Sequence, residues 1–152
     1  MKMKRHMVMV VAALLALSAC TAVSKDQRYR KMIVGSWIMA ANSSDYIPVP
    51  MREVFLPSGQ YRFYVYSDAS CSHVTATVDT TWKIKNGVLI TRVTYASNPR
   101  LGPVGSVMRD KIISITRTRM ALHSLDDGTT YSRTRSKGCL AEPKNHSGGL
   151  LT

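Results

Sequence analysis

Residues 73–96, HVTATVDTTWKIKNGVLITRVTYA, decide the fold of this chain. From His73 to Lys85 apolar side chains alternate with polar or charged ones, and this period of two predicts a strand with one buried face. Asn86-Gly87 then predicts a tight hairpin, because a type I′ turn needs a positive φ at both central positions. The predicted register pairs Lys85 with Val88, Ile84 with Leu89, Trp82 with Thr91, Thr80 with Val93, and Val78 with Tyr95.

A second hairpin is predicted around Pro57 and Gly59. Proline suits the first corner of a type I turn, and glycine suits the left-handed position of a G1 bulge. Pairing Leu56 with Gln60 gathers apolar side chains and one carboxylate on the same face. The expected inner face of this hairpin consists of Met51, Glu53, Phe55, Tyr61, Phe63 and Val65.

A third hairpin is predicted at residues 126–128, Asp-Asp-Gly, where two registers compete. A two-residue turn sets Leu122 opposite Arg133 and places charges on the inner face. A turn with a G1 bulge sets Leu122 opposite Ser132 instead. Burying an unpaired guanidinium costs far more than a bulge, so the second register is favoured. The side chains expected on the outer face are then Tyr131, Arg133 and Arg135.

Turn signals at regular intervals divide the chain into about eight strands without an internal repeat. This pattern predicts an all-β fold, an antiparallel up-and-down barrel. Before the strands, Ser24 and Gln27 form a capping-box pattern, which predicts one short helix. The expected strands are Val34–Ala41, Pro50–Leu56, Gln60–Tyr66, His73–Lys85, Val88–Ala96, Val104–Ile115, Met120–Leu125 and Thr129–Ser136.

Two motifs within residues 32–137 resemble those of lipocalins. Gly35-Ser36-Trp37, at the start of the first strand, matches the family's G-x-W motif, and residues 55–61 (F-x-P-x-G-x-Y) are similar to a run in bacterial lipocalin-like lipoproteins. The resemblance implies a lipocalin-like barrel domain over residues 32–139, with room for one small ligand. It also implies that Trp37 plugs the closed end beneath an arginine, with Arg133 and Arg135 as the candidates. An open or collapsed barrel is the alternative.

The first twenty residues have the order of an export signal. Lys2, Lys4 and Arg5 precede an apolar stretch, residues 7–17, that is too short to span a ~30 Å hydrocarbon core. Residues 17–20, Leu-Ser-Ala-Cys, resemble the lipobox of bacterial lipoproteins. That resemblance implies a signal peptide at 1–19, palmitate or similar acyl chains on Cys20, and a linker with the short helix at 20–31. The alternative is an ordinary signal peptide.

The residue after Cys20 indicates which of the two bacterial membranes would hold the lipoprotein. Thr21 is not the aspartate that keeps many such lipoproteins in the inner membrane. The same resemblance therefore implies an outer-membrane lipoprotein of the cell envelope that faces the periplasm. Several acyl chains hold a protein there essentially permanently.

Cys71 and Cys139 remain after export, in a compartment that permits disulfides. We expect them to pair. A strict eight-strand meander nevertheless places them at opposite ends of the barrel, whereas the Cα atoms of a disulfide lie within about 7 Å. Either the chain folds back after the last strand, a strand is miscounted, or the bridge does not form.

Composition limits the number of domains and the kinds of partner that we expect. The 152 residues, 45% hydrophobic and 20% charged, suit one domain. The formal net charge is +12, of which three positive charges belong to the export signal. Nucleic acid is not an expected partner in the envelope. Residues 140–152 lack periodicity and are expected to be a disordered tail.

The inner face offers a candidate ligand site. Glu53 is placed to hold the polar group of a ligand, among aromatic side chains. The alternative is that Glu53 forms an ion pair and the aromatic residues fill the core. The candidate ligand-binding residues are Glu53, Tyr61, Phe63, Trp82 and Tyr95.

Catalytic motifs are not recognisable in the sequence. His73, His123 and His146 lack metal-ligand spacing, and neither a nucleophile elbow nor a phosphate-binding loop is present. A Ser-His-Asp site assembled from distant positions stays open. We expect no metal, no cofactor and no enzymatic activity.

Basic residues recur at period two in the second half of the chain. On a strand they share a face, and such a face attracts anionic lipid, lipopolysaccharide or an acidic protein. The alternative is a solvated exterior. The residues concerned are Arg109, Lys111, Arg117, Arg119, Arg133, Arg135 and Lys137.

Two hypotheses of function follow. The first is a lipid-anchored, lipocalin-like barrel that binds a small apolar ligand or an envelope component. The second is an inhibitor or immunity-type protein that blocks a periplasmic enzyme, with the barrel as a scaffold for loops 42–50, 67–73 and 97–105.

Overall fold

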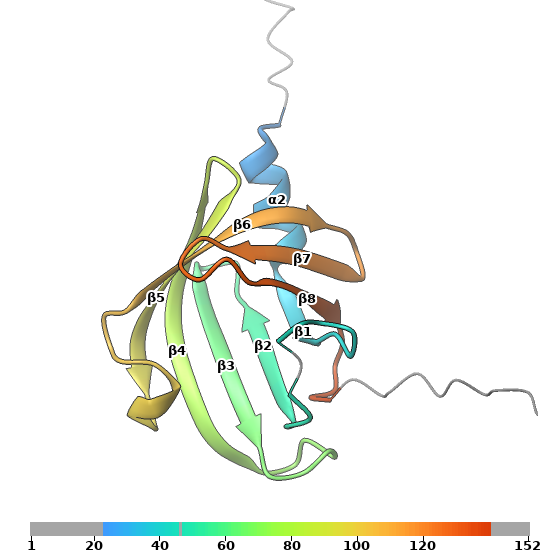
Figure 1. Cartoon of the computed structure of the whole chain (residues 1–152), viewed down its shortest axis with the longest axis vertical. Helices are drawn as coiled ribbons and strands as arrows, with labels where there is room; N and C mark the ends of the chain where they lie inside the picture. Colours follow the sequence, from blue (N-terminus) through green and yellow to red (C-terminus); the bar gives the residue numbers. More distant parts are fainter. Residues whose placement is uncertain (1–22, 46, 141–152) are drawn as a thin grey trace, which may run out of the picture.

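The structure is a computed structural model, and it describes residues 23–45 and 47–140. These residues form a helix and eight antiparallel strands that close into a barrel in chain order, with β8 pairing back onto β1 (Figure 1). The predicted fold class is confirmed. The elements are α2 (Lys25–Ile33), β1 (Gly35–Met39), β2 (Met51–Phe55), β3 (Gln60–Tyr66), β4 (Val74–Lys85), β5 (Val88–Ala96), the 3-10 helix η1 (Pro99–Leu101), β6 (Val107–Ile115), β7 (Arg119–Ser124) and β8 (Thr130–Arg135).

Some expectations lie outside the described residues: the export signal, Cys20, and the tail beyond Leu140. The predicted capping box is present, because the Ser24 hydroxyl accepts from the Gln27 amide and the Gln27 side chain accepts from the Ser24 amide. No helix in the described part of the chain is long and apolar enough to cross a membrane.

The barrel has two different ends. The closed end is covered by α2, and there the Asp26 carboxylate accepts hydrogen bonds from the amides of Asn86 and Gly87, at 2.7 and 2.8 Å. The opposite end, which we call the loop end, carries the segments 40–50, 67–73, 97–106 and 125–129. Residues near the start of β2, β4, β6 and β8 therefore lie toward the loop end.

Trp37 fills the closed end and is fully buried. Its indole N–H donates to the Ile33 carbonyl at 2.7 Å, and the Arg135 guanidinium lies 4.2 Å from the ring centroid. Arg135 also donates to the carbonyls of Val34 and Met32, at 2.8 and 2.6 Å. Of the two candidate arginines, Arg135 is the one over Trp37. A Cβ on Gly35 would come within 2.1 Å of the Arg135 guanidinium, so glycine is required there.

The hairpins around Gly59 and Gly87 have most of the expected pairs. The expected pairing of Val78 with Tyr95 is wrong. A β-bulge between Asp79 and Thr80 shifts the register, so Tyr95 pairs with Asp79 and its side chain is 51% exposed. A bulge adds one unpaired residue, and that residue reverses which face the following side chains occupy.

The third hairpin has neither expected register. Leu122 pairs with Tyr131 and Met120 with Arg133, across a four-residue loop that is closed by the Ser124 amide on the Thr129 carbonyl. Arg133 is therefore on the inner face and 6% exposed, so the outward placement of Tyr131, Arg133 and Arg135 was wrong. The prediction assumed that a guanidinium inside the barrel would be unpaired and therefore costly to bury. Arg133 instead forms ion pairs with two carboxylates.

The disulfide between Cys71 and Cys139 is confirmed, with Cα atoms 5.8 Å apart. Its apparent conflict with the meander is resolved because the chain folds back after β8. The Lys137 carbonyl accepts from Arg52 Nη1, and the Cys139 carbonyl accepts from the Met51 amide. Residues 136–139 thus run toward the start of β2, at the loop end, where Cys71 lies.

Candidate functional site

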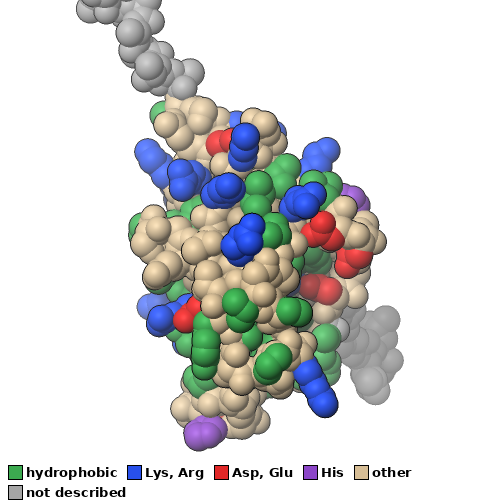
Figure 2. Space-filling model, turned by 90° about the vertical axis from the view of Figure 1, so that its left-hand side faces the viewer, with side chains coloured by type: hydrophobic (Ala, Val, Ile, Leu, Met, Phe, Trp, Pro, Cys, Tyr) green, Lys and Arg blue, Asp and Glu red, His purple; other side chains and the backbone are tan. Residues whose placement is uncertain are grey.

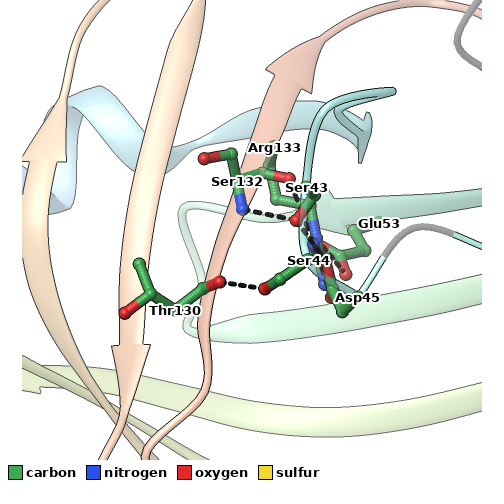
Figure 3. Close-up of polar contacts among 7 residues, drawn as sticks. All are labelled: Ser43, Ser44, Asp45, Glu53, Thr130, Ser132 and Arg133. Carbon is green, nitrogen blue, oxygen red and sulfur yellow. Dashed lines mark hydrogen bonds and ion pairs between the residues drawn. The ribbon is translucent and has the colours of Figure 1, made fainter.

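A buried ion-pair cluster occupies the half of the lumen nearer the loop end (Figure 3). Arg133 on β8 donates from Nε to Glu53 Oε1 at 3.0 Å, and its Nη1 lies 2.9 Å from Asp45 Oδ2. Glu53 comes from β2, and Asp45 comes from the segment between β1 and β2. One guanidinium therefore joins three separate parts of the chain inside the barrel. We call Asp45, Glu53 and Arg133 the lumen cluster.

Two carboxylates compensate the buried positive charge of Arg133. Burial by itself lowers the pKa of an arginine, but the negative charges of Glu53 and Asp45 outweigh that effect, and the pKa of Arg133 lies above its ordinary value. Its guanidinium also lies 4.5 Å from the centroid of the Tyr131 ring. The Glu53 carboxylate is consequently occupied by a partner within the protein.

Short polar contacts fasten the segment carrying Asp45 across the start of β8. The Ser132 amide donates to the Ser43 hydroxyl at 2.8 Å, and the Ser43 hydroxyl donates to Asp45. The Ser44 hydroxyl donates to the Thr130 carbonyl (Figure 3). These contacts place the Asp45 carboxylate over the lumen.

Asp110 on β6 is a second buried acid, 6% exposed. Burial raises its pKa, while a hydrogen bond with the Tyr131 hydroxyl acts in the opposite direction. Burial also raises the pKa of Tyr131, and the nearby charge of Asp110 adds to that shift. Among the described residues no Lys, Arg or His lies within ion-pair distance of Asp110.

An unpartnered hydroxyl lies beside Asp110 on the inner wall. Thr91 pairs with Met108, and Leu89 pairs with Asp110, so Thr91 and Asp110 are diagonal neighbours on the same face. Thr91 is 4% exposed, and its hydroxyl has no hydrogen-bond partner within the described part of the protein. We call Thr91, Met108 and Asp110 the acidic wall.

The acidic wall reaches solvent at the loop end. Met108 shares a face with buried Thr91 and yet is 43% exposed. Phe63, on the inner face of β3, is only half-buried. Closer to the closed end on β5 and β6, Leu89 and Ile112 are buried in the core, as is Trp82, which pairs with Thr91. The barrel interior is therefore packed toward the closed end, whereas Met108 and Phe63, nearer the loop end, keep part of their surface exposed. We call this loop-end half of the interior the open half.

The five candidate ligand-binding residues do not form one pocket. Tyr61 stacks on Phe55 at 4.5 Å, and Trp82 meets Phe55 edge-on at 5.8 Å, so these rings fill the core. The Trp82 indole N–H is bonded to backbone carbonyls. Glu53 belongs to the lumen cluster and Phe63 to the open half, whereas Tyr95 lies outside the barrel. Burial, with the charge of Glu53 adding, raises the pKa of Tyr61 well above its ordinary value.

Two hollows are formed elsewhere on the described part of the protein. One of about 300 Å³ lies along β3–β5 beside Arg62 and Asp79, and one of about 350 Å³ lies between α2 and the β2–β3 turn, beside Arg30 and Pro57. No three His, Cys, Asp or Glu side chains among the described residues come together as metal ligands.

The acidic wall was not predicted, although the sequence held a signal for it. Met108, Asp110 and Ile112 alternate with Arg109 and Lys111 on the strand that became β6. Period two therefore places one acid among apolar residues on the inner face. The role of Asp45 had no such signal, because it lies outside the strands.

Comparison with solved structures bears on the fold. A lipocalin-like protein from Bacteroides uniformis matches with a TM-score of 0.52 and 13% sequence identity, covering 68% of this chain and 98% of that one. The fold is lipocalin-like. An uncharacterized protein from Bacteroides eggerthii is similar over 68% of this chain and 99% of its own, with a TM-score of 0.48 and 16% identity. No protein-family model and no curated protein sequence matches the chain.

Proposed function

We propose that this chain is a non-catalytic binding protein whose lumen holds a small, largely apolar molecule carrying a cationic or hydrogen-bond-donating group. The observation that carries the proposal is the acidic wall. Within the described residues, Asp110 is buried with no cation at ion-pair distance and the Thr91 hydroxyl is buried without a partner, both next to the partly exposed Met108. Buried polar groups normally have partners, because leaving one unpaired costs about 1–3 kcal/mol. Ligand donor groups would give the Thr91 hydroxyl a partner and would give Asp110 one in addition to the Tyr131 hydroxyl.

The charge of the lumen supports this ligand class. Asp45, Glu53 and Asp110 supply three carboxyl groups against the single guanidinium of Arg133. A ligand ammonium or amide N–H gains from the excess of acceptors, whereas a carboxylate ligand meets like charge in a medium of low dielectric constant. The apolar body of the ligand would pack against Phe63 and Met108.

The site of action that we propose is the cell envelope. The lipobox-like residues 17–20 support acylation at Cys20 and attachment to the outer membrane on its periplasmic side. The disulfide is consistent with an oxidising compartment. The barrel would then present its lumen to small molecules beside the membrane.

Native mass spectrometry tests the binding role. The chain from Thr21 onward, made in the periplasm without an anchor and purified without detergent, is expected to carry a bound small molecule. Asp110→Asn should reduce the bound fraction, and Asp126→Asn, an exposed acid at the same end, should not. A wild-type chain that is reproducibly empty would contradict the proposal.

A second candidate function is an interaction protein that blocks a periplasmic enzyme. It is favoured by exposed apolar side chains on the loop end: Ile47 is 52% exposed, Leu101 42% and Val104 67%. Capture of one defined enzyme from envelope extracts, lost in Val104→Ser and retained in Asp110→Asn, would support this alternative. The opposite dependence would support the lumen.

A further inference from the structure

Positive charge gathers at the closed end of the barrel. Figure 2 shows many of the Lys and Arg side chains of this face in the half of the molecule where α2 lies. Six exposed residues from three separate segments form what we call the basic collar. They are Lys25, Arg28 and Lys31 on α2, Lys85 at the end of β4, Arg117 in the β6–β7 turn and Arg119 at the start of β7.

Acidic groups do not balance the collar. Asp26 is the one acidic side chain on α2, and its carboxylate is bonded to the amides of Asn86 and Gly87. The acids Asp68, Asp126 and Asp127 belong to loop-end segments. The described residues are therefore polarised along the barrel axis, with net positive charge at the closed end.

The basic face expected from the sequence is thereby revised. Arg133 and Arg135 are engaged within the barrel, by carboxylates and by Trp37 with backbone carbonyls. Neither is available to a surface partner. Arg117 and Arg119 remain exposed, and α2 contributes charges that were not included in that face.

The collar lies close to the proposed anchor along the chain. Four residues lie between Cys20 and Lys25, and the five Cα–Cα steps between them span at most ~18 Å when fully extended. An acylated Cys20 would therefore hold the start of α2 near the headgroup layer. Attraction between exposed charges reaches about 10 Å at 0.1 M salt, so the collar would be within or near that range.

We propose that the basic collar docks on the anionic phosphate headgroups of the membrane that carries the anchor. The proposal rests on the lipid anchoring included in the proposed function. Docking at the closed end points the loop end, with the open part of the lumen, away from the bilayer. Ligands would then enter from the aqueous compartment and not from the lipid phase.

Fluorescence quenching on vesicles tests this orientation with the full acylated chain. A fluorophore on Thr118→Cys reports on the collar, and one on Val104→Cys reports on the loop end. The disulfide stays intact because labelling uses no reductant. With a quencher on the lipid headgroups, the fluorophore at 118 should be quenched on phosphatidylglycerol-rich vesicles at low salt, and the one at 104 should not. Raising the salt to 1 M, or using phosphatidylcholine vesicles, should abolish the difference.

Two variants with equal loss of charge distinguish an effect of the basic collar from an effect of the net charge of the protein. The triple change Arg28→Gln, Arg117→Gln, Arg119→Gln should weaken docking by roughly fivefold for each charge removed, as expected for basic residues near an anionic surface. The control Arg100→Gln, Arg109→Gln, Lys137→Gln removes three positive charges outside the collar and should leave quenching unchanged. Tryptophan emission checks that every variant is folded.

The outcomes distinguish the collar from the anchor. Flotation of the wild-type chain with vesicles, lost in Cys20→Ala, reports anchoring alone. Anchoring with equal quenching at 104 and 118, or with quenching at 118 that ignores lipid charge, would overturn the collar proposal. Equal loss of quenching in both triple variants would also overturn it. Failure to float would refute the anchor itself.

Discussion

The two ends of the barrel use the same residue type for different purposes. Arg135 and Arg133 lie two positions apart on β8. Arg135 stacks over Trp37 and is bonded to backbone carbonyls, and no carboxylate among the described residues pairs with it. Arg133 is bonded to Glu53 and Asp45 and lies beside Tyr131. The closed end therefore satisfies its cation with dipoles and an aromatic face, whereas the open half holds charges of both signs.

This difference between the two ends predicts that the closed end contributes mainly to stability and the open half mainly to ligand binding. At the closed end the side chains of Trp37 and Arg135 have hydrogen-bond partners and apolar side chains fill the remaining space, although the buried Ser36 hydroxyl has none among the described residues. In the open half, Thr91 lacks a partner and Asp110 lacks a cation among the described residues. Proteins commonly give up stability at sites of function. The effects of substitutions on the free energy of unfolding should therefore differ in size between the two ends and, for one residue, in sign.

Trp37→Ala should have the largest effect, because it empties the closed end. We expect the free energy of unfolding to fall by about 3–5 kcal/mol, the usual cost of truncating a buried tryptophan. Urea denaturation followed by circular dichroism measures the loss. A fall below about 1 kcal/mol would mean that Trp37 does not hold the closed end together.

Arg133→Gln should cost about 3 kcal/mol, because it leaves the buried Glu53 and the partly buried Asp45 without their cation. The matched control is Arg62→Gln, which breaks the exposed pair with Asp79 and should cost less than about 1 kcal/mol. Equal losses in the two variants would show that the lumen cluster is not shielded from solvent.

Arg135→Gln should cost about 2 kcal/mol, since it removes the stacking on Trp37 and three hydrogen bonds to carbonyls. Ligand binding should be unchanged in this variant, because Arg135 lies at the closed end. Thermal melting and a binding titration on the same sample check both statements. If Arg135→Gln bound ligand more weakly at unchanged stability, the closed end would not differ from the open half in the way that we describe.

Asp110→Asn should have the smallest effect and the opposite sign. Burial raises the pKa of Asp110 in the folded state. Between the unfolded carboxyl pKa of about 4 and the higher folded value, the folded chain binds more protons, so wild-type stability falls as pH rises through this window. The variant lacks this loss and should melt at a higher temperature at pH 7.

Melting curves between pH 4 and pH 8 check that sign. The difference between Asp110→Asn and wild type should grow with pH and then level off. A variant that is less stable than wild type at pH 7 would indicate that the ionised Asp110 has a stabilising partner.

Regular alternation made much of the fold predictable from the sequence. Asn86-Gly87 and Gly59 specify turns whose register follows from chain geometry, so Trp82 and Phe55 were correctly placed on the inner face. The errors arose where a side chain changed face for non-local reasons. The bulge beside Thr80 moved Tyr95 outward, and a four-residue loop moved Arg133 inward.

The proposed binding site was harder to predict than the barrel. Arg133 is tolerated inside because Asp45 reaches over the lumen from a segment without strand periodicity. Only the closed structure brings that carboxylate to β8. The fold-back of residues 136–139, which joins Cys139 to Cys71, likewise depends on contacts with β2.

The central claim is that the acidic wall selects a cationic or donor ligand. It is tested most directly by comparing two soluble probes with the same apolar ring and opposite charge, 1-naphthylmethylamine and 1-naphthaleneacetate, by NMR of the methyl groups of Thr91 and Met108. The amine is predicted to shift both signals in wild type, with a much weaker effect in Asp110→Asn, and the acid is predicted to shift neither. Equal binding of the two probes, or an amine affinity that survives Asp110→Asn unchanged, would contradict the account.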